Sequence, residues 1–288
     1  MKRTVLFLAA AATVSTVLAG FKYEGEWRCD SGDLLGVDVA PNGNVYTNEG
    51  PSGTSGGVVK YFTPTGSLLG SWPDSQAGVA VAPNGNVYTG GCNSYPIRYY
   101  TPTGSLLGSW NPPNYVWGGD VAANGNVFIC GAPIADGNPG NVYICTPTGS
   151  LLGSWPCRSG DVEVSRNNVV YVVDRGEGVV YYNTAGTRLG HINSKGCEGV
   201  AVAPNGDVFL TNRNHYVERF AGSGSFIEAW GQRGSGPGEF EFPSGIAVSP
   251  TGERVYVADS GNDRIQYFNR NEPAVTPTSL GCVKALFR

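Results

Sequence analysis

The sequence predicts an all-β protein, a six-bladed β-propeller of four-stranded antiparallel blades in which the N-terminal strand completes the last blade. The segment TPTGSLLGSW occurs three times without change, at Thr63–Trp72, Thr101–Trp110 and Thr146–Trp155. A second landmark, an apolar triplet followed by a turn and a short apolar run, recurs six times, with its turn at Gly43, Gly85, Gly125, Asn168, Gly206 and Gly252. The steps between these turns are 42, 40, 43, 38 and 46 residues, which is the period of propeller blades.

Each repeat unit is predicted to contain four strands. The first is a short Val-x-Val piece, and the Asn or Gly that follows it supplies the positive φ that a tight hairpin needs. The second and third strands, such as NVYT and IRYYTP, are rich in the β-branched and aromatic residues that favour pleated sheet. SLLGSW forms the fourth. A β-sandwich is the weaker alternative, because nothing in a sandwich requires its sequence to repeat.

The ring is predicted to close through the N-terminus. Six copies of the first three strands follow Leu35, but only five fourth strands accompany them, ending at Trp72, Trp110, Trp155, near Ile192 and at Trp230. Phe21–Trp27 (FKYEGEW) ends in Trp like the other outer strands. We therefore expect Phe21–Trp27 to supply the outer strand of blade six, which removes a free sheet edge.

The last repeat unit resembles the NHL repeat family. Gly231–Asn269 contains Gly-Pro-Gly-x-Phe, then Pro-x-Gly-Ile-Ala-Val, then Val-Ala-Asp-Ser-Gly-Asn-Asp-Arg-Ile. Blades one to four have largely lost the last element, and Asp174 with Arg175 keeps part of it. The resemblance implies a six-bladed propeller from about Phe21 to Asn269. The family includes enzymes, RNA-binding modules, protein-interaction modules and extracellular sensors, so the fold does not settle function.

Three regions are expected along the chain. Residues 1–19 have Lys2 and Arg3, an apolar run and a small-residue cleavage site at Ala19, the pattern of a secretory signal peptide. Residues 20–270 form the propeller. Residues 271–288 are a Pro/Thr linker with a short tail, either a sorting or anchoring segment or an element packed on the ring. The protein is therefore expected to be secreted or held at the cell surface.

Composition excludes some partners. Loss of Lys2 and Arg3 with the leader changes the formal net charge from −4 to −6, and only four lysines remain. Nucleic-acid binding thus lacks its basic footprint. No later segment is apolar enough to span a membrane, and a monomer is expected.

Of the seven cysteines, Cys157 and Cys197 in adjacent inter-blade loops are the expected disulfide pair.

Binding is expected on the face formed by the two-to-three loops and the inter-blade connections. These segments, Asn111–Trp117 and Gly231–Ser244 among them, differ from blade to blade, whereas the turns of the opposite face are monotonous. Aromatic platforms with convergent polar groups suit a protein, peptide or carbohydrate ligand. The candidate contacts are Tyr95, Tyr115, Trp117, Arg158, Arg175, Glu177, Asn212, Arg213, His215 and Arg233. The alternative for each aromatic residue is that it covers a blade edge.

Three carboxylates share the middle position of the first strand. They are Asp38, Asp120 and Glu163, while the other blades carry Ala there. Close to the axis they could hold Ca²⁺ or another divalent metal, which takes several oxygen ligands. The alternative, which we favour, is solvation in the channel with hydrogen bonds to neighbouring backbone amides. No cofactor is otherwise expected.

The sequence favours a binding or surface-interaction module over an enzyme. A metal-dependent lactonase or hydrolase with acidic residues in the channel is the alternative, resting on Asp38, Asp120 and Glu163. Propeller lyases that amidate peptides bind zinc through several histidines, and this chain has only His191 and His215. The Gly-x-Ser-x-Gly match around Ser55 has no helix after it to form a nucleophile elbow. No catalytic residue is assigned.

Overall fold

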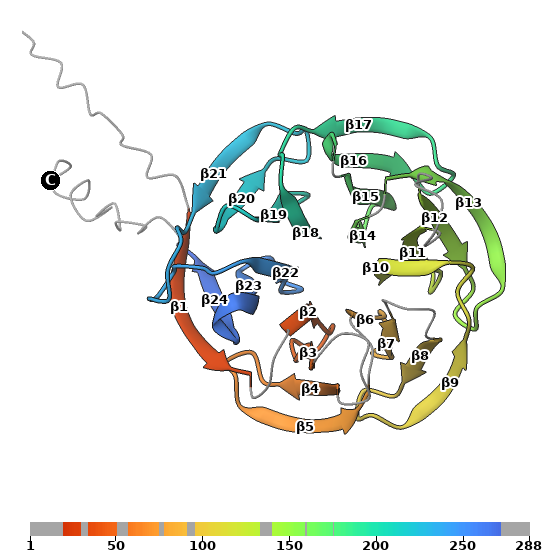
Figure 1. The fold of residues 1–288 in the computed structure, drawn as a ribbon, viewed down its shortest axis with the longest axis horizontal. Coiled ribbons are helices and arrows are strands. Elements are labelled where there is room, and N and C mark those ends of the chain that lie inside the picture. The colour runs from red at the N-terminus through yellow and green to blue at the C-terminus, as the bar shows by residue number, and fades with distance from the viewer. Residues whose placement is uncertain are drawn as a thin grey trace, which may run out of the picture.

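Six four-stranded antiparallel sheets stand radially around one axis, so the protein is a six-bladed β-propeller, as predicted (Figure 1). The structure, a computed structural model, describes residues 20–29, 34–50, 57–74, 78–90, 96–132, 140–158, 160–174 and 176–271. The predicted leader and all but the first residue of the predicted tail lie outside these ranges. Within them, no helix is long and apolar enough to cross a bilayer.

Blades one to five each run from the inner to the outer strand in chain order. Blades one and two comprise β2 (Leu34–Val39), β3 (Val45–Glu49), β4 (Val58–Phe62), β5 (Leu68–Pro73), β6 (Gly78–Val81), β7 (Val87–Gly90), β8 (Ile97–Tyr100) and β9 (Leu106–Trp110). Blades three and four comprise β10 (Tyr115–Val121), β11 (Val127–Ala132), β12 (Gly140–Cys145), β13 (Leu151–Cys157), β14 (Val162–Val164), β15 (Val169–Asp174), β16 (Gly178–Asn183) and β17 (Arg188–Ile192). Blade five comprises β18 (Cys197–Val202), β19 (Val208–Asn212), β20 (Tyr216–Phe220) and β21 (Phe226–Trp230).

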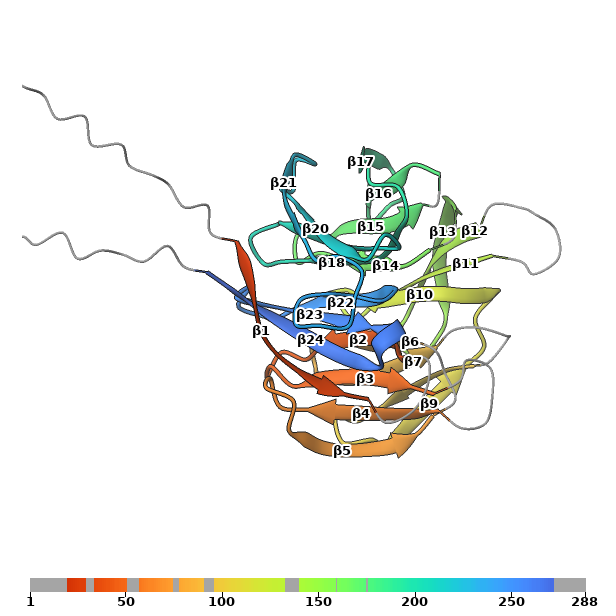
Figure 2. The ribbon, with the colours of Figure 1, turned by 60° about the vertical axis from the view of Figure 1, so that its left-hand side comes forward.

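Blade six is built from both ends of the chain. Its strand order is β22 (Pro243–Val248), β23 (Arg254–Asp259), β24 (Arg264–Arg270) and then β1 (Phe21–Arg28), which lies outermost (Figure 2). β1 pairs antiparallel with β24 along its whole length. The backbone N–H of Asn271 donates to the carbonyl of Gly20 at 2.7 Å. The predicted closure by the N-terminal strand is confirmed.

The NHL-like element of blade six fixes this closure through one buried arginine. The guanidinium of Arg264 donates to Asp259 in β23 and to Glu26 in β1, each at 2.8 Å. It also donates at 2.9 Å to three carbonyls of the 231–240 connection, those of Ser235, Gly236 and Glu239. A buried charge needs such complete pairing, because its desolvation is otherwise costly. Arg264 therefore holds β1, β23 and the Gly-Pro-Gly-x-Phe loop together.

The apolar core is divided into six clusters, each of which joins two adjacent blades. At the seam between blades one and two, for example, Tyr46, Val59 and Trp72 pack with Val87 and Tyr100. The closing seam has the same composition, with Trp27 of β1 packed among residues of blades six and one. Each blade is thus covered only by its neighbours, which explains why the ring needs all six.

Each copy of the repeated TPTGSLLGSW segment contributes to two seams. Its turn glycine faces the preceding blade, and its Trp faces the next blade. Its Trp lies over the turn glycine of the next blade: a Cβ on Gly104 would come within 2.5 Å of the Trp72 ring, and one on Gly66 within 2.6 Å of Trp27. These glycines also have φ near +92°, which non-glycine residues rarely adopt. In β5, a Cβ on Gly70 would lie 2.7 Å from the ring of Tyr61, so this glycine leaves room for the tyrosine.

The expected pairing of Cys157 with Cys197 is wrong. The Sγ of Cys157 lies 3.1 Å from that of Cys130 instead. Cys197 packs in a different core cluster, between blades four and five. The sequence placed both residues in inter-blade loops, whereas Cys157 is the last residue of β13 and Cys197 the first residue of β18.

Replacement of a turn glycine tests the seam directly. Gly104→Ala introduces a positive-φ penalty and a clash with Trp72, whereas Gly206→Ala introduces only the penalty, because Gly206 has φ +90° and no heavy atom within 4 Å of its added Cβ. We expect Gly104→Ala to cost about 1–3 kcal/mol more unfolding free energy than Gly206→Ala, the usual cost of overpacking. Urea unfolding of both variants measures the difference. Equal losses would show that the Trp–Gly contact is not tight.

Candidate functional site

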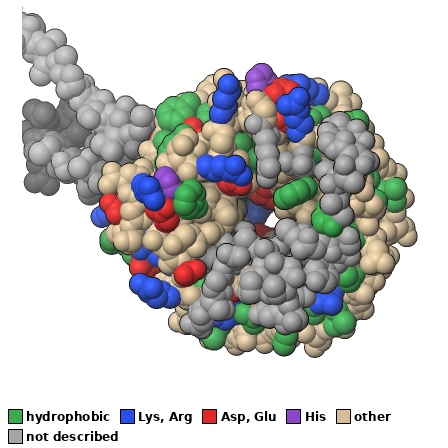
Figure 3. Space-filling view, viewed as in Figure 1, with side chains coloured by type: hydrophobic (Ala, Val, Ile, Leu, Met, Phe, Trp, Pro, Cys, Tyr) green, Lys and Arg blue, Asp and Glu red, His purple; other side chains and the backbone are tan. Residues whose placement is uncertain are grey.

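A pocket of about 330 Å³ opens at the axis, where the inner strands begin. Figure 3 shows the molecule hollowed at this point. A glycine within or just before each of the six inner strands contributes to its wall: Gly36, Gly78, Gly118, Gly160, Gly199 and Gly245. A Cβ on Gly118 or on Gly199 would lie 2.5 Å from an atom of the next blade, so these glycines let the inner strands converge. Apolar side chains, Val79, Val116 and Ile129 among them, form much of the rest of the wall.

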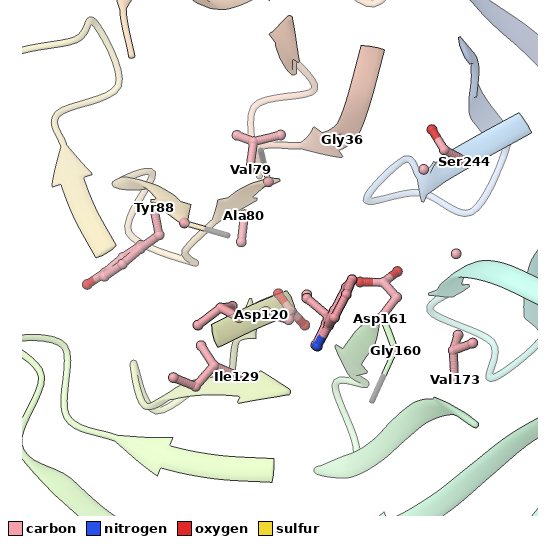
Figure 4. A pocket seen from close by; sticks show the side chains of 18 of the residues that line it. Gly36, Val79, Ala80, Tyr88, Asp120, Ile129, Gly160, Asp161, Val173 and Ser244 are labelled. Atoms are coloured by element: carbon pink, nitrogen blue, oxygen red, sulfur yellow. The ribbon is translucent and has the colours of Figure 1, made fainter. Parts of the chain in front are cut away.

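Three carboxylates line the pocket: Asp120 of β10, Asp161 just before β14, and Glu198 of β18. Figure 4 shows the side chains of Asp120 and Asp161 on the same side of the pocket. Glu198 forms an ion pair with Arg213. No Lys, Arg or His is found among the described lining residues. The pocket therefore presents carboxyl oxygens as hydrogen-bond acceptors beside glycines and apolar side chains.

The inner-strand carboxylates also bind neighbouring blades. Asp38 accepts from the N–H of Val39 and from that of Val81 in blade two, both at 2.6 Å. Asp120 accepts in the same way from Val121 at 2.6 Å and from Val164 in blade four at 2.7 Å. These bonds to backbone amides of the neighbouring blade are one part of the interpretation we favoured, which also expected the carboxylates to be solvated in the channel.

Blade four repeats this interaction twice. Asp161 accepts from Val162 at 3.0 Å and from Val200 in blade five at 3.1 Å. Glu163 accepts from the N–H of Val202 at 3.3 Å. The inner strands β14 and β18 are thus linked by two carboxylates at alternate positions.

Burial dominates the electrostatics of this group. Desolvation raises the pKa of Asp38 and of Asp161 to about 7, although the backbone hydrogen bonds lower it. Burial also raises the pKa of Asp120, and that of Glu163 well above its usual range, where Asp120 and Asp38 add repulsion. Four carboxylates that share one channel cannot all ionise easily near neutral pH.

The described residues do not include a cluster of three or more His, Cys, Asp or Glu side chains able to hold a metal ion. Asp38, Asp120 and Glu163 are each engaged with backbone amides of adjacent blades. His191 lies in the outer strand β17, and His215 lies in the β19–β20 loop of another blade. These positions offer no histidine set for zinc.

The structure describes eight of the ten predicted contact residues, and they lie in different surroundings. Tyr95 and Arg175 lie outside the described residues. Trp117 lines the axial pocket and is 51% exposed, while Tyr115 is half-buried. Both belong to β10, so the expected inter-blade loop Asn111–Trp117 is shorter than predicted.

Asn212 is a structural residue. It is fully buried, donates to the carbonyl of Lys195 at 3.1 Å, and accepts from the N–H of Asn214 at 3.0 Å. Its amide group therefore folds the β19–β20 loop and is not free for a ligand. The sequence could not distinguish this role from binding, because loop amides serve both purposes.

The charged candidates form ion pairs on the surface. Glu177 pairs with Arg188 at 2.5 Å, and Arg233 makes two bonds to Glu241 at 3.0 and 3.1 Å. Arg158 is exposed. Exposed pairs of this kind stabilise little and remain available to a partner.

His215 contributes to an aromatic platform that the sequence did not predict. Its ring lies 4.7 Å from that of Phe242, and its Nδ1 accepts from the backbone N–H of Phe242 at 3.1 Å. Phe242 is 56% exposed and has φ +49°, while His215 has φ +69°. A bulky residue held in the left-handed region is strained, and such strain gathers at functional positions. Arg233 and Glu241 flank this platform.

Asp161, Glu198 and Phe242 are thus the candidates that sequence reasoning missed. Asp161 and Glu198 precede the Val-x-Val strand and fall outside the repeated position. Phe242 follows the Gly-Pro-Gly-x-Phe element and looks like an ordinary core residue. One feature of the sequence could have identified Asp161: it directly follows Gly160, the glycine that precedes the inner strand of blade four.

A family model for the NHL repeat matches residues 240–268. The chain is a six-bladed propeller whose last blade is an NHL repeat. It is 40% identical over 76 residues to peptidylglycine α-amidating monooxygenase of Rattus norvegicus, and 41% identical over 76 residues to that of Mus musculus. Each match covers 24% of this chain and 8% of the relative, so the chain spans a small part of these proteins.

Among solved structures, virginiamycin B lyase from Staphylococcus aureus is similar in fold. The TM-score is 0.60 at 14% identity, and the match covers 87% of this chain and 99% of the other. At this identity the likeness extends to the fold alone.

The raised carboxylate pKa values predict how stability depends on pH. Since Asp38 and Asp161 have pKa values of about 7 when folded and 3.8 ordinarily, the folded state holds more protons between about pH 4 and 7. Stability therefore falls as pH rises through this window and levels off above it. We expect the Tm to be higher at pH 5 than at pH 8. Asp38→Asn should reduce this difference, and Glu24→Gln on the exposed side of β1 should leave it unchanged. A Tm that rises from pH 5 to pH 8 would contradict the assignment.

Proposed function

We propose that the protein is a secreted binding module that takes a peptide ligand at the axial pocket of its variable-loop face. The observation that supports this most is the pocket itself, since a concave apolar wall with a few polar groups is the usual form of a ligand site. Trp117 at its rim offers a large exposed aromatic surface. The signal-peptide pattern of residues 1–19 supports secretion.

The chemistry of the lining favours a ligand group that donates hydrogen bonds or carries positive charge. Asp120 and Asp161 supply acceptors, and no basic side chain among the described lining residues pairs with them, while Glu198 is already paired with Arg213. A volume of about 330 Å³ is at the small end for ligand pockets, enough for one side chain or an amino terminus. The local similarity to peptidylglycine α-amidating monooxygenase supports a peptide as the ligand class. A carbohydrate stacked on Trp117 or Phe242 is the competing ligand.

A metal-dependent lactonase or hydrolase is the second candidate function. The observation in its favour is that Asp161, which lines the pocket, has a pKa near 7, where a carboxylate can serve as a general base. A lactone panel assayed with Ca²⁺ and with EDTA separates the candidates. Turnover that is lost in EDTA or in Asp161→Asn would favour the enzyme, and we expect none.

The binding proposal is tested with two exposed aromatic residues. Trp117 and Phe226 are 51% and 58% exposed, but Phe226 lies in the outer strand β21, away from the pocket. Peptides selected from a displayed library with the mature protein, alongside a glycan array, provide the probe. We expect Trp117→Ala to weaken peptide binding at least about tenfold, typical of a central aromatic contact, and Phe226→Ala to leave it unchanged.

Several results would contradict this placement. Equal affinity of the Trp117→Ala variant and the wild type would remove the pocket from the site. Binding to glycans and not to peptides would replace the ligand class. Acetylation of the peptide amino terminus and its lysines should also weaken binding, because the lining offers acceptors.

A further inference from the structure

Two cysteine side chains of blade three meet in the core. Cys130 lies in β11 and Cys157 ends β13, and their Sγ atoms are 3.1 Å apart. Cys130 is fully buried and Cys157 is 6% exposed. The other described cysteines, Cys29, Cys145 and Cys197, pack in three other core clusters. Among the five cysteines that the structure describes, this proximity is therefore specific to one pair.

The strand between the two cysteines leaves space for them to approach. Cys130 pairs with Val142 of β12, and Cys157 pairs with Gly140 of the same strand. Paired residues of an antiparallel sheet place their side chains on one face, so both sulfurs and the side chain of Val142 lie on the same face. Gly140 has no side chain there, and nothing on it separates the two sulfurs. The Sγ atoms lie about 1 Å beyond bonding distance, and since β11 and β13 lie on either side of β12, closing the bond also draws these two strands together.

We infer that Cys130 and Cys157 are a thiol–disulfide modification site, which a small-molecule disulfide such as oxidised glutathione converts to an intramolecular disulfide. One cysteine thiolate attacks the oxidant, breaks its S–S bond and releases one thiol. The second cysteine loses its proton and attacks the mixed disulfide, forming the Cys130–Cys157 bond and releasing the other thiol. Two electrons pass from the pair to the oxidant, and two protons are carried away by the released thiols.

The surroundings act in opposite directions on the two thiols. The hydrogen bond with Cys157 lowers the pKa of Cys130, as does the backbone N–H of Gly160, whereas the same hydrogen bond and burial raise the pKa of Cys157. The thiolate is the reactive form of cysteine. Gly160 also lines the axial pocket, so the bond forms directly behind the pocket wall.

The cross-link joins the second and outer strands of one blade across its third strand. It closes a loop in which the two cysteines are 27 positions apart in sequence. Restricting that loop in the unfolded chain should stabilise the fold. The inference does not depend on the proposed ligand, and its failure would leave the binding proposal unaffected.

The experiment compares the full-length purified protein after oxidised glutathione and after dithiothreitol. Peptide mapping without reduction should identify one internal link, between the peptides that contain Cys130 and Cys157. The oxidised form should melt on the order of 5–10 °C higher. Cys130→Ser and Cys157→Ser should each abolish the link and the Tm difference, while Cys145→Ser, another buried cysteine, should retain both.

Other results would overturn the inference. Full alkylation of both thiols after oxidation would do so, as would a link from either cysteine to Cys92, Cys197 or Cys282. A mixed disulfide with glutathione that persists on Cys157 would show that the sulfurs cannot meet. Mapping of the wild type decides the question even where a serine variant folds poorly.

Discussion

The structure depends on the contact between the outer Trp of one blade and the turn glycine of the next. A four-stranded blade exposes two apolar faces and cannot bury either by itself, so each blade relies on the seams at its sides. The Trp–Gly contact recurs at Trp27–Gly66, Trp72–Gly104 and Trp155–Gly186. The same contact joins Trp110 to Gly149, whereas Ile192 takes the place of the Trp at the seam between blades four and five. Because each blade is covered only by its neighbours, the ring is stable only when it is closed. The N-terminal strand β1 meets that requirement by bringing Trp27 to blade one.

Side-chain hydrogen bonds reinforce every seam, but the donor and acceptor groups change around the ring. Second-strand tyrosines donate to a turn carbonyl of the next blade, as Tyr256 does to Pro64 at 3.0 Å and Tyr46 to Pro102 at 2.9 Å. Inner-strand carboxylates take this role between blades three, four and five. Thr211 bonds the carbonyl of Ser244 between blades five and six. The carboxylates that make the axial pocket acidic therefore also link adjacent blades. This structural role accounts for their presence at positions where burial opposes ionisation.

Much of the fold could be predicted from the sequence because a repeat exposes its own constraints. The spacing of the turn residues gave the number of blades, and the count of outer strands required the N-terminus for closure. Asp38, Asp120 and Glu163 were also recognisable as axial residues, since they occupy one repeated position. The site could not be predicted in the same way, because the residues that line the axial pocket and its surrounding loops depart from the repeat.

The missed features depend on relations between strands that no single segment carries. Asn212 is buried by its loop, and Phe242 adopts a left-handed backbone that its residue type disfavours. The approach of Cys130 to Cys157 follows from the glycine opposite Cys157 in β12. The repeated leucine pairs, Leu68–Leu69 among them, look like core residues but are about half exposed, because the start of each outer strand lies at the rim of the ring.

Removal of residues 20–29 tests the central claim most directly. Without β1, blade six loses its outer strand and Glu26, the partner of Arg264. It also loses Trp27, which covers the turn glycine Gly66 of blade one. The account predicts that thermal unfolding of the truncated protein becomes broad and begins well below that of the intact ring. A truncated protein that unfolds in one sharp transition at the same temperature would contradict it.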